Sequence, residues 1–210
     1  MQKHTLDTLK NFASINNGIA IKKGSRLRTI SVMDNLFATA ALKEEFDRDF
    51  AIYDLNEFLA TIGLFNDPKM EYKADHILIS SGASKIKYFY SSDAVVYAAP
   101  EKDLAEPAAL IKFTLTKSGL DELIKAASVM KLKEVAFNSK GLRAFNKSAG
   151  GNQYTASFDT EGDDDGEYVV NIDNLKMVPG TYTVQVSDRF VLFKLQGDAE
   201  LSYFVAVEAS

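Results

Sequence analysis

The stretch Leu6-Asp7-Thr8-Leu9, followed by Ala13-Ser14-Ile15, returns after a shift of 114 residues as Leu120-Asp121-Glu122-Leu123, followed by Ala127-Ser128-Val129. In both stretches the apolar side chains have the spacing of an amphipathic helix. A repeat of this kind predicts a chain made of two similar halves.

A second pair of strings supports the duplication. Phe50–Asn56 and Tyr168–Asn174 are similar, and they follow the first pair at comparable distances. Chance similarity between short helices is the alternative, because Leu, Asp and Ala are common residues. The repeated order of strand, helix and strands favours duplication.

Composition limits the class of protein. The chain has 210 residues, 46% of them hydrophobic and 25% charged, which fits one large or two small globular domains. No apolar run is long enough to span a bilayer, and no signal-peptide pattern is expected at the N-terminus. The chain has no Cys, so disulfides, zinc–thiolate sites and thiol catalysis are excluded, and a reducing cytoplasm is the expected location.

The net charge of −5 comes from an acidic excess in the second half of the chain. This balance argues against a protein that coats nucleic acid with its whole surface, but it allows lysines to be confined to one face.

Four helices are predicted among many strands. Their N-caps are Thr5, Asp54, Thr116 and Asn171, and the first, third and fourth helices end near Ile15, Met130 and Met177. The second helix is expected to bury Leu55, Phe58, Leu59 and Ile62, and the third to bury Leu120, Leu123, Ile124 and Ala127. Strands are predicted at residues 19–22, 27–33, 37–42, 50–53, 70–72, 76–80, 85–90, 111–115, 134–138, 141–146, 154–159, 168–170, 181–186, 190–196 and 202–207. This pattern predicts an α+β fold with antiparallel sheets.

The middle of the chain reads as a connector. It is rich in Ala, contains Pro100 and Pro107 and lacks periodicity. The expected division is therefore an N-terminal domain at residues 1–97, a connector at 98–110 and a C-terminal domain at 111–210.

No arrangement of residues predicts catalysis. The acidic run Glu161–Glu167 has the spacing of a calcium loop, but the position of the last ligand is occupied by Ile172, which favours a solvated loop over a metal site. His4 and His76 lack a neighbouring nucleophile, and no phosphate-binding glycine loop is present. We expect no metal and no cofactor, and a binding or scaffolding protein rather than an enzyme.

Four strings carry a resemblance to a known family: LKNFASINNGI at Leu9–Ile19, FAIYDLNEFL at Phe50–Leu59, NLKMVPGTY at Asn174–Tyr182, and YFVAVEAS at the C-terminus. In this order they resemble the sliding clamp of T-even-type tailed bacteriophages, the processivity factor of the replicative DNA polymerase. The similarity is strong at the four strings and loose between them.

The resemblance implies a DNA-clamp fold of two similar domains, each made of two β-α-β-β-β units, with antiparallel sheets outside and helices lining a ring. It implies a homotrimer that encircles double-stranded DNA without reading its sequence and that performs no chemistry. The implied partners are the DNA polymerase, a clamp-loader ATPase complex and late-transcription RNA polymerase factors, in the host cytoplasm of an infected bacterium and away from membranes.

Three groups of residues are expected to serve such a ring. The alternative for each group is that its residues only face solvent or pack in the core, with no part in binding. The DNA-facing candidates are Lys3, Lys10, Lys117, Lys125, Lys131, Lys133 and Lys176. The subunit-interface candidates are Lys85, Ile86, Lys87 and Tyr88, facing Tyr154, Ala156 and Phe158 of a neighbour. The partner-groove candidates are Met33, Leu36, Phe37, Val205 and Val207, of which the first three are expected in a loop.

Two other functions stay open at this point. One is a β-rich phage structural protein of the tail or baseplate with no DNA role, and the other is an enzyme that uses the acidic loop.

Overall fold

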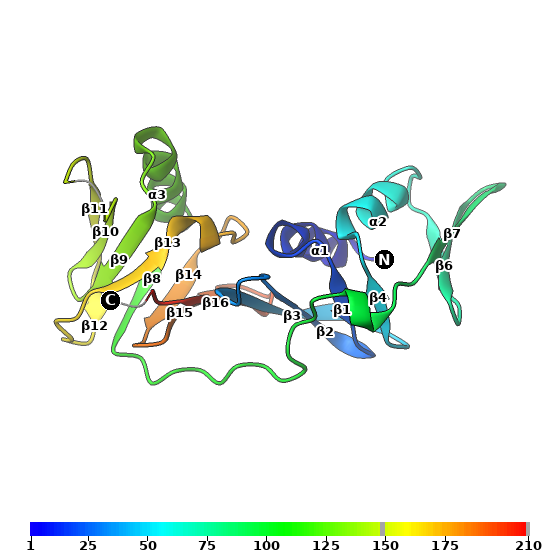
Figure 1. Cartoon of the computed structure of the whole chain (residues 1–210), viewed down its shortest axis with the longest axis horizontal. Coiled ribbons are helices and arrows are strands. Elements are labelled where there is room, and N and C mark those ends of the chain that lie inside the picture. The colour runs from blue at the N-terminus through cyan, green and yellow to red at the C-terminus, as the bar shows by residue number, and fades with distance from the viewer. Residues whose placement is uncertain (148–149, 209–210) are drawn as a thin grey trace. The chain divides into compact units, whose positions relative to one another are not determined.

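A computed structural model describes residues 1–147 and 150–208 of the chain. The fold is mixed, with α-helices and antiparallel strands, as the sequence predicts. The chain forms two compact units, one made of Met1–Met33 and Phe37–Asp103 and the other of Asp34–Leu36 and Leu104–Ser210 (Figure 1). Within the described residues, each helix is too short or too polar to cross a membrane.

The first unit places two helices beside short antiparallel sheets (Figure 1). Its elements are α1 (Lys3–Ile15), β1 (Ile19–Ile21), β2 (Gly24–Ile30), β3 (Leu36–Phe46), β4 (Phe50–Ile52), α2 (Leu55–Ile62), β5 (Lys69–Tyr72), β6 (His76–Ser81), β7 (Ser84–Phe89) and a 3₁₀ turn, η1 (Asp93–Val95). Strand β1 pairs with β4, β2 pairs with β3, and β5-β6-β7 form a three-stranded sheet. Helices α1 and α2 pack against each other.

The second unit has one long helix and two groups of strands. Its elements are β8 (Ile111–Leu115), α3 (Lys117–Met130), β9 (Glu134–Asn138), β10 (Gly141–Phe145), β11 (Tyr154–Ser157), β12 (Thr160–Glu161), β13 (Tyr168–Asn171), a 3₁₀ turn η2 (Ile172–Asn174), β14 (Tyr182–Val186), β15 (Phe190–Leu195) and β16 (Leu201–Ala206). A four-stranded sheet has the order β11-β10-β9-β13, and other strands follow the order β12-β8-β14-β15-β16.

Two of the N-caps predicted for the first three helices are confirmed. The Asp54 carboxylate accepts a hydrogen bond from the Glu57 backbone N–H at 2.9 Å, and the Thr116 hydroxyl accepts one from the Gly119 N–H at 3.1 Å. Each bond satisfies a backbone donor that the first helical turn leaves unpaired. The predicted cap at Thr5 is wrong, because α1 begins at Lys3 and Thr5 lies buried within it.

The predicted fourth helix is wrong beyond its first turn. The Asn171 side chain caps η2 by accepting the Asp173 N–H at 2.9 Å, as predicted, but Leu175 has ψ 53° and leaves the helical region. The Leu175 side chain is buried, and its packing in the core fixes this turn. In a continued helix, the Leu175 side chain would lie elsewhere. Lys176 therefore does not lie on a helix.

In α2 and α3, burial follows the predicted helix faces with two exceptions. In α2, Leu55, Phe58 and Ile62 are buried, whereas Leu59 is only half-buried. In α3, Leu120, Leu123 and Ala127 are buried as predicted. The prediction that Ile124 is buried is wrong, because this residue lies at the edge of the apolar stripe and is 36% exposed.

Gly141 begins β10 at a position that only glycine tolerates. Its φ is +139°, and a Cβ placed there would collide with the carbonyl oxygen of Ala156 in the adjacent strand β11. The close approach of β11 to β10 therefore depends on the missing side chain.

Candidate nucleic-acid interface

Helix α1 carries lysines on the face opposite its core. Thr8, Leu9 and Phe12 point inward, whereas the side chains of Lys3 and Lys10 are 89% and 65% exposed. Between them, the Asp7 carboxylate pairs with both ammonium groups, at 2.5 Å from Lys3 and 3.9 Å from Lys10. The exposed face of α1 is therefore basic but partly neutralised.

Helix α3 presents a similar face. Lys117 and Lys125 are exposed on the side away from Leu120 and Leu123, and Asp121 lies between the two lysines. Thr116 fixes where this helix begins and so fixes which side chains face solvent. A shallow groove borders the face, between α3 and residues 175–179, and Ile124 and Lys125 help to line it.

The remaining lysine candidates lie outside helices. Lys131 ends α3 in the left-handed conformation, with φ 55°, and is exposed. The Lys133 backbone N–H donates to the Asn146 side chain at 2.9 Å, which fixes the chain between α3 and β9. Lys176 follows η2 and is exposed, but not on the helix that was predicted for it.

Helix α2 has no lysine and is acidic at its start. Asp54 is engaged in capping the helix, and Glu57 is exposed. Both carboxylates are attracted to the positive end of the helix dipole, which stabilises the helix, so the acidity of α2 has a structural cause.

The interface candidates lie on two strands at the edges of their sheets. Within the described residues, β7 pairs only with β6 in the sheet β5-β6-β7, and β11 pairs only with β10. An edge strand leaves backbone donors and acceptors open to another strand. Of the candidates, Phe158 lies just beyond β11, where its ring stacks on Phe113 at 5.1 Å.

Aromatic side chains hold strand β7 against the rest of the first unit. The ring of Tyr88 lies 5.0 Å from that of Phe58 in α2, and its hydroxyl donates to the Asp54 carbonyl at 3.3 Å. Just after the strand, Tyr90 stacks on Phe50 at 5.0 Å. Burial, the largest influence, raises the pKa of the Tyr88 hydroxyl above its ordinary value of 10.0, so the hydroxyl stays protonated and donating in alkaline solution as well. These contacts fix the orientation of the β7 edge.

The partner-groove candidates are mostly core residues. The expectation that Leu36 and Phe37 lie in a loop is wrong, because both belong to β3 and are buried. Val205 is also buried, in β16, where the hydrophobic strand pattern packs it inward. Met33 is 79% exposed and Val207 is half-buried, so these two retain accessible surface.

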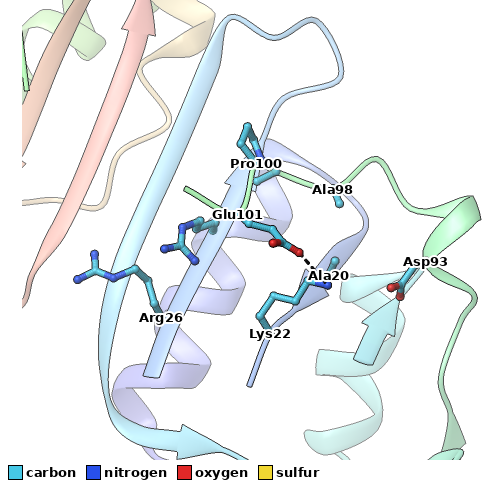
Figure 2. A pocket seen from close by; sticks show the side chains of 9 residues that line it. Ala20, Lys22, Arg26, Asp93, Ala98, Pro100 and Glu101 are labelled. Atoms are coloured by element: carbon cyan, nitrogen blue, oxygen red, sulfur yellow. Dashed lines mark ion pairs between the residues drawn. The ribbon is translucent and has the colours of Figure 1, made fainter. Parts of the chain in front are cut away.

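The connector begins with a cluster of ion pairs that the sequence pattern did not predict. The Asp103 carboxylate accepts from Arg28 at 2.7 Å and from the Thr39 hydroxyl at 3.0 Å, and it lies 3.2 Å from Arg26. Glu101 pairs with Lys22 at 3.3 Å (Figure 2). We call Glu101 and Asp103, with their basic partners, the connector clasp.

Beside Glu101 of the connector clasp lies a cavity of about 120 Å³. Alanine side chains of the connector and the stems of Lys22, Arg26 and Arg28 line it (Figure 2). Further along the connector, Glu106 pairs with Lys194 at 2.6 Å within the second unit. Asp103 thus anchors the connector to the first unit, and Glu106 anchors it to the second.

The Asp103 clasp predicts a pH dependence. Burial opposes ionisation of Asp103, but hydrogen bonds from Arg28 and Thr39 outweigh it and hold the pKa below the ordinary value of 3.8. A depressed pKa stabilises the fold above pH 3.8 and ceases to do so as the pH falls through the folded-state pKa. Asp103→Asn should lower the free energy of unfolding by up to about 1 kcal/mol at pH 7, with the difference vanishing in acid. Thermal melts at several pH values measure this; a difference that does not shrink as the pH is lowered from 7 to below 3.8 would contradict it.

The acidic loop is organised by its own hydrogen bonds. Asp164 Oδ1 accepts from the Gly166 N–H and from the Tyr168 hydroxyl, both at 2.8 Å. Among the residues that the structure describes, His, Asp and Glu side chains form no group of three or more that could hold a metal ion.

Solved structures identify the fold. Proliferating cellular nuclear antigen from Entamoeba histolytica aligns with 98% of this chain and 95% of its own, with a TM-score of 0.72 at 12% identity. The Helicobacter pylori beta clamp, solved with a DNA ligase peptide, aligns with 99% of this chain and 65% of its own, with a TM-score of 0.65 at 11% identity. At such low identity the similarity shows the fold alone, and that fold is the DNA clamp expected from the sequence.

Sequence relatives are more specific. The sliding clamp of Vibrio phage KVP40 is 30% identical over 100% of this chain and 99% of its own length, and that of Enterobacteria phage T4 is 30% identical over 100% and 96%. The family described as DNA polymerase processivity factor matches residues 2–96. The chain therefore belongs to the sliding clamps, the processivity factors of DNA polymerases. These are non-enzymatic scaffolds, and the tail or baseplate alternative is not favoured.

Proposed function

We propose that three copies of this chain close head to tail into a ring around duplex DNA and tether the replicative DNA polymerase to it. The observation that carries the proposal is the pair of exposed lysine faces on α1 and α3, Lys3 with Lys10 and Lys117 with Lys125, in a chain of net charge −5. Lysines contact phosphates without reading bases, and an acidic exterior repels DNA elsewhere.

Ring closure follows from the two edge strands. Strand β7 belongs to one unit and β11 to the other, so β7 of one copy pairs with β11 of the next in a heterologous contact that repeats around the ring. In this proposal Lys131, Lys133 and Lys176 add positive charge near α3, and α2 supports the β7 edge rather than attracting DNA. Met33 and Val207 are the groove candidates that remain accessible.

The proposal includes further partners by analogy with the family. A clamp-loader ATPase opens the ring, late-transcription RNA polymerase factors use it as a platform, and the ring acts in the host cytoplasm of an infected bacterium. The relatives are phage proteins, which supports this setting.

A linear duplex with biotin at both ends tests encirclement without a loader. A ring threads over an open end, so protein added before streptavidin should be trapped on the DNA and resist a high-salt wash. Protein added after streptavidin should wash away. Sedimentation should show a trimer at micromolar concentration. Equal recovery in both orders of addition, or a stable monomer, would contradict the proposal.

A further inference from the structure

The exposed faces of α1 and α3 repeat three residues besides the core. Lys3, Asp7 and Ser14 correspond under the same shift to Lys117, Asp121 and Ser128, and all six side chains are at least partly exposed. Core positions must match for two helices to pack alike, but exposed positions have no packing reason to match. A shared acidic residue in the middle of two basic faces therefore points to a role of its own.

In α1 the acidic residue contacts both lysines of its face. Asp7 Oδ2 lies 2.5 Å from the Lys3 ammonium and Oδ1 lies 3.9 Å from that of Lys10, with the carboxylate 48% exposed. The face thus carries two positive charges and one negative charge. In α3, Asp121 lies four residues after Lys117 and four before Lys125, the spacing at which side chains on one helix face meet.

Helix stability gives little reason for these acids. Exposed ion pairs at this spacing contribute about 0.3–0.5 kcal/mol. Asp7 lies beyond the first turn of α1, where the attraction of a carboxylate to the helix dipole has largely decayed.

We propose that Asp7 and Asp121 limit how strongly the two lysine faces hold DNA phosphates and so keep the ring mobile along the duplex. The inference rests on the proposed encirclement. In α1, each ammonium must share or leave the Asp7 carboxylate to contact a phosphate, which weakens the phosphate contact. In α3, the negative charge of Asp121 lies on the same helix face as Lys117 and Lys125 and lowers the positive potential there. Passing from one phosphate to the next then costs less, and enclosure retains the ring on DNA without strong contacts.

The double variant Asp7→Asn with Asp121→Asn tests this role. The matched control, Asp188→Asn with Asp198→Asn, removes two exposed acids from the turns that flank β15. In the trimer, the helix variant should bind open-ended linear duplex about ten-fold more tightly at low salt, with a steeper salt dependence, and diffuse more slowly along stretched DNA. The turn variant should match the wild type.

A second variant separates charge from side-chain shape. Asp7→Glu with Asp121→Glu keeps both negative charges and should restore wild-type affinity, salt dependence and diffusion. Wild-type behaviour of the Asn variant on DNA that traps the ring would overturn this inference alone. Failure of the wild type to be trapped by end blocking would instead overturn encirclement, and this inference with it.

Discussion

Replacing Lys10 and Lys125 by Glu should weaken binding to duplex DNA roughly 100-fold or more at low salt. Each chain then has two fewer exposed positive charges and two more negative ones on the faces of α1 and α3. Repulsion would oppose entry of DNA into the ring, and fewer phosphates would be neutralised by lysine. Titration of fluorescent duplex at several salt concentrations measures the effect. The slope of log affinity against log salt should become shallower by about 0.9 for each phosphate that is no longer neutralised.

The matched control makes the same charge change elsewhere. Lys43→Glu in β3 with Lys140→Glu in the β9–β10 turn alters exposed lysines that do not lie on helices. It should leave most of the affinity and the salt slope intact. Equal weakening in both variants would show that net charge alone governs binding, and unchanged binding in both would remove the lysine faces from the proposed function.

Tyr88→Ala should dissociate the trimer more readily, with a dissociation constant at least ten-fold higher. The Tyr88 ring packs on Phe58 and its hydroxyl donates to the Asp54 carbonyl, so this residue orients the proposed interface strand β7. Removing the half-buried ring should also lower the free energy of unfolding by about 2 kcal/mol. Sedimentation across a concentration series measures the assembly, and chemical denaturation measures the stability.

Two control variants separate the interface from general destabilisation. Tyr88→Phe keeps the ring contact and removes only the hydroxyl bond, so the trimer should persist. Val184→Ala removes buried apolar volume from β14 in the second unit, lowering stability by a similar amount without touching either edge strand. If Val184→Ala dissociates the trimer as much as Tyr88→Ala does, β7 has no special role in assembly.

Local signals in the sequence predicted much of the fold. Asp54 and Thr116 cap their helices as expected, because a side-chain oxygen three residues before a free N–H is a local geometric relation. Strands β8 and β9 have the predicted limits, since alternating or continuous apolar residues define them. The predicted strand 154–159 ends earlier, at Ser157, and the short strand β12 that follows at Thr160–Glu161 was not predicted. The two strands pair with different partners, β11 with β10 and β12 with β8.

Features that depend on distant contacts could not be predicted. Burial of Leu175 stops the fourth helix after one turn. Burial of Leu36 makes this residue the start of β3, one residue before the strand predicted at 37–42. The order of strands, which puts β7 and β11 at sheet edges, has no local signal in the sequence.

The candidate site could likewise be predicted only where the signal is local in the sequence. The exposed lysines of α1 and α3 follow from helical periodicity, so the sequence pattern predicts their faces correctly. The pairing of Asp7 with both lysines was not predicted, although its spacing of four and three residues could have shown it. The connector clasp was not predicted because Arg28 and Asp103 are far apart in the chain, and only the alternation Glu101-Lys102-Asp103 hinted at ionic contacts.

Gly141 has a consequence for the proposed ring rather than for the isolated chain. A single methyl group at this position would push β11 away from β10 and spoil one joining edge while leaving β7 on the same chain able to pair. If three copies close into the proposed ring, one faulty joint is enough to leave a gap. If half of the subunits carried Gly141→Ala, roughly one proposed ring in eight would contain only sound copies, so this change should act as a dominant inhibitor of ring closure when co-expressed with the natural protein.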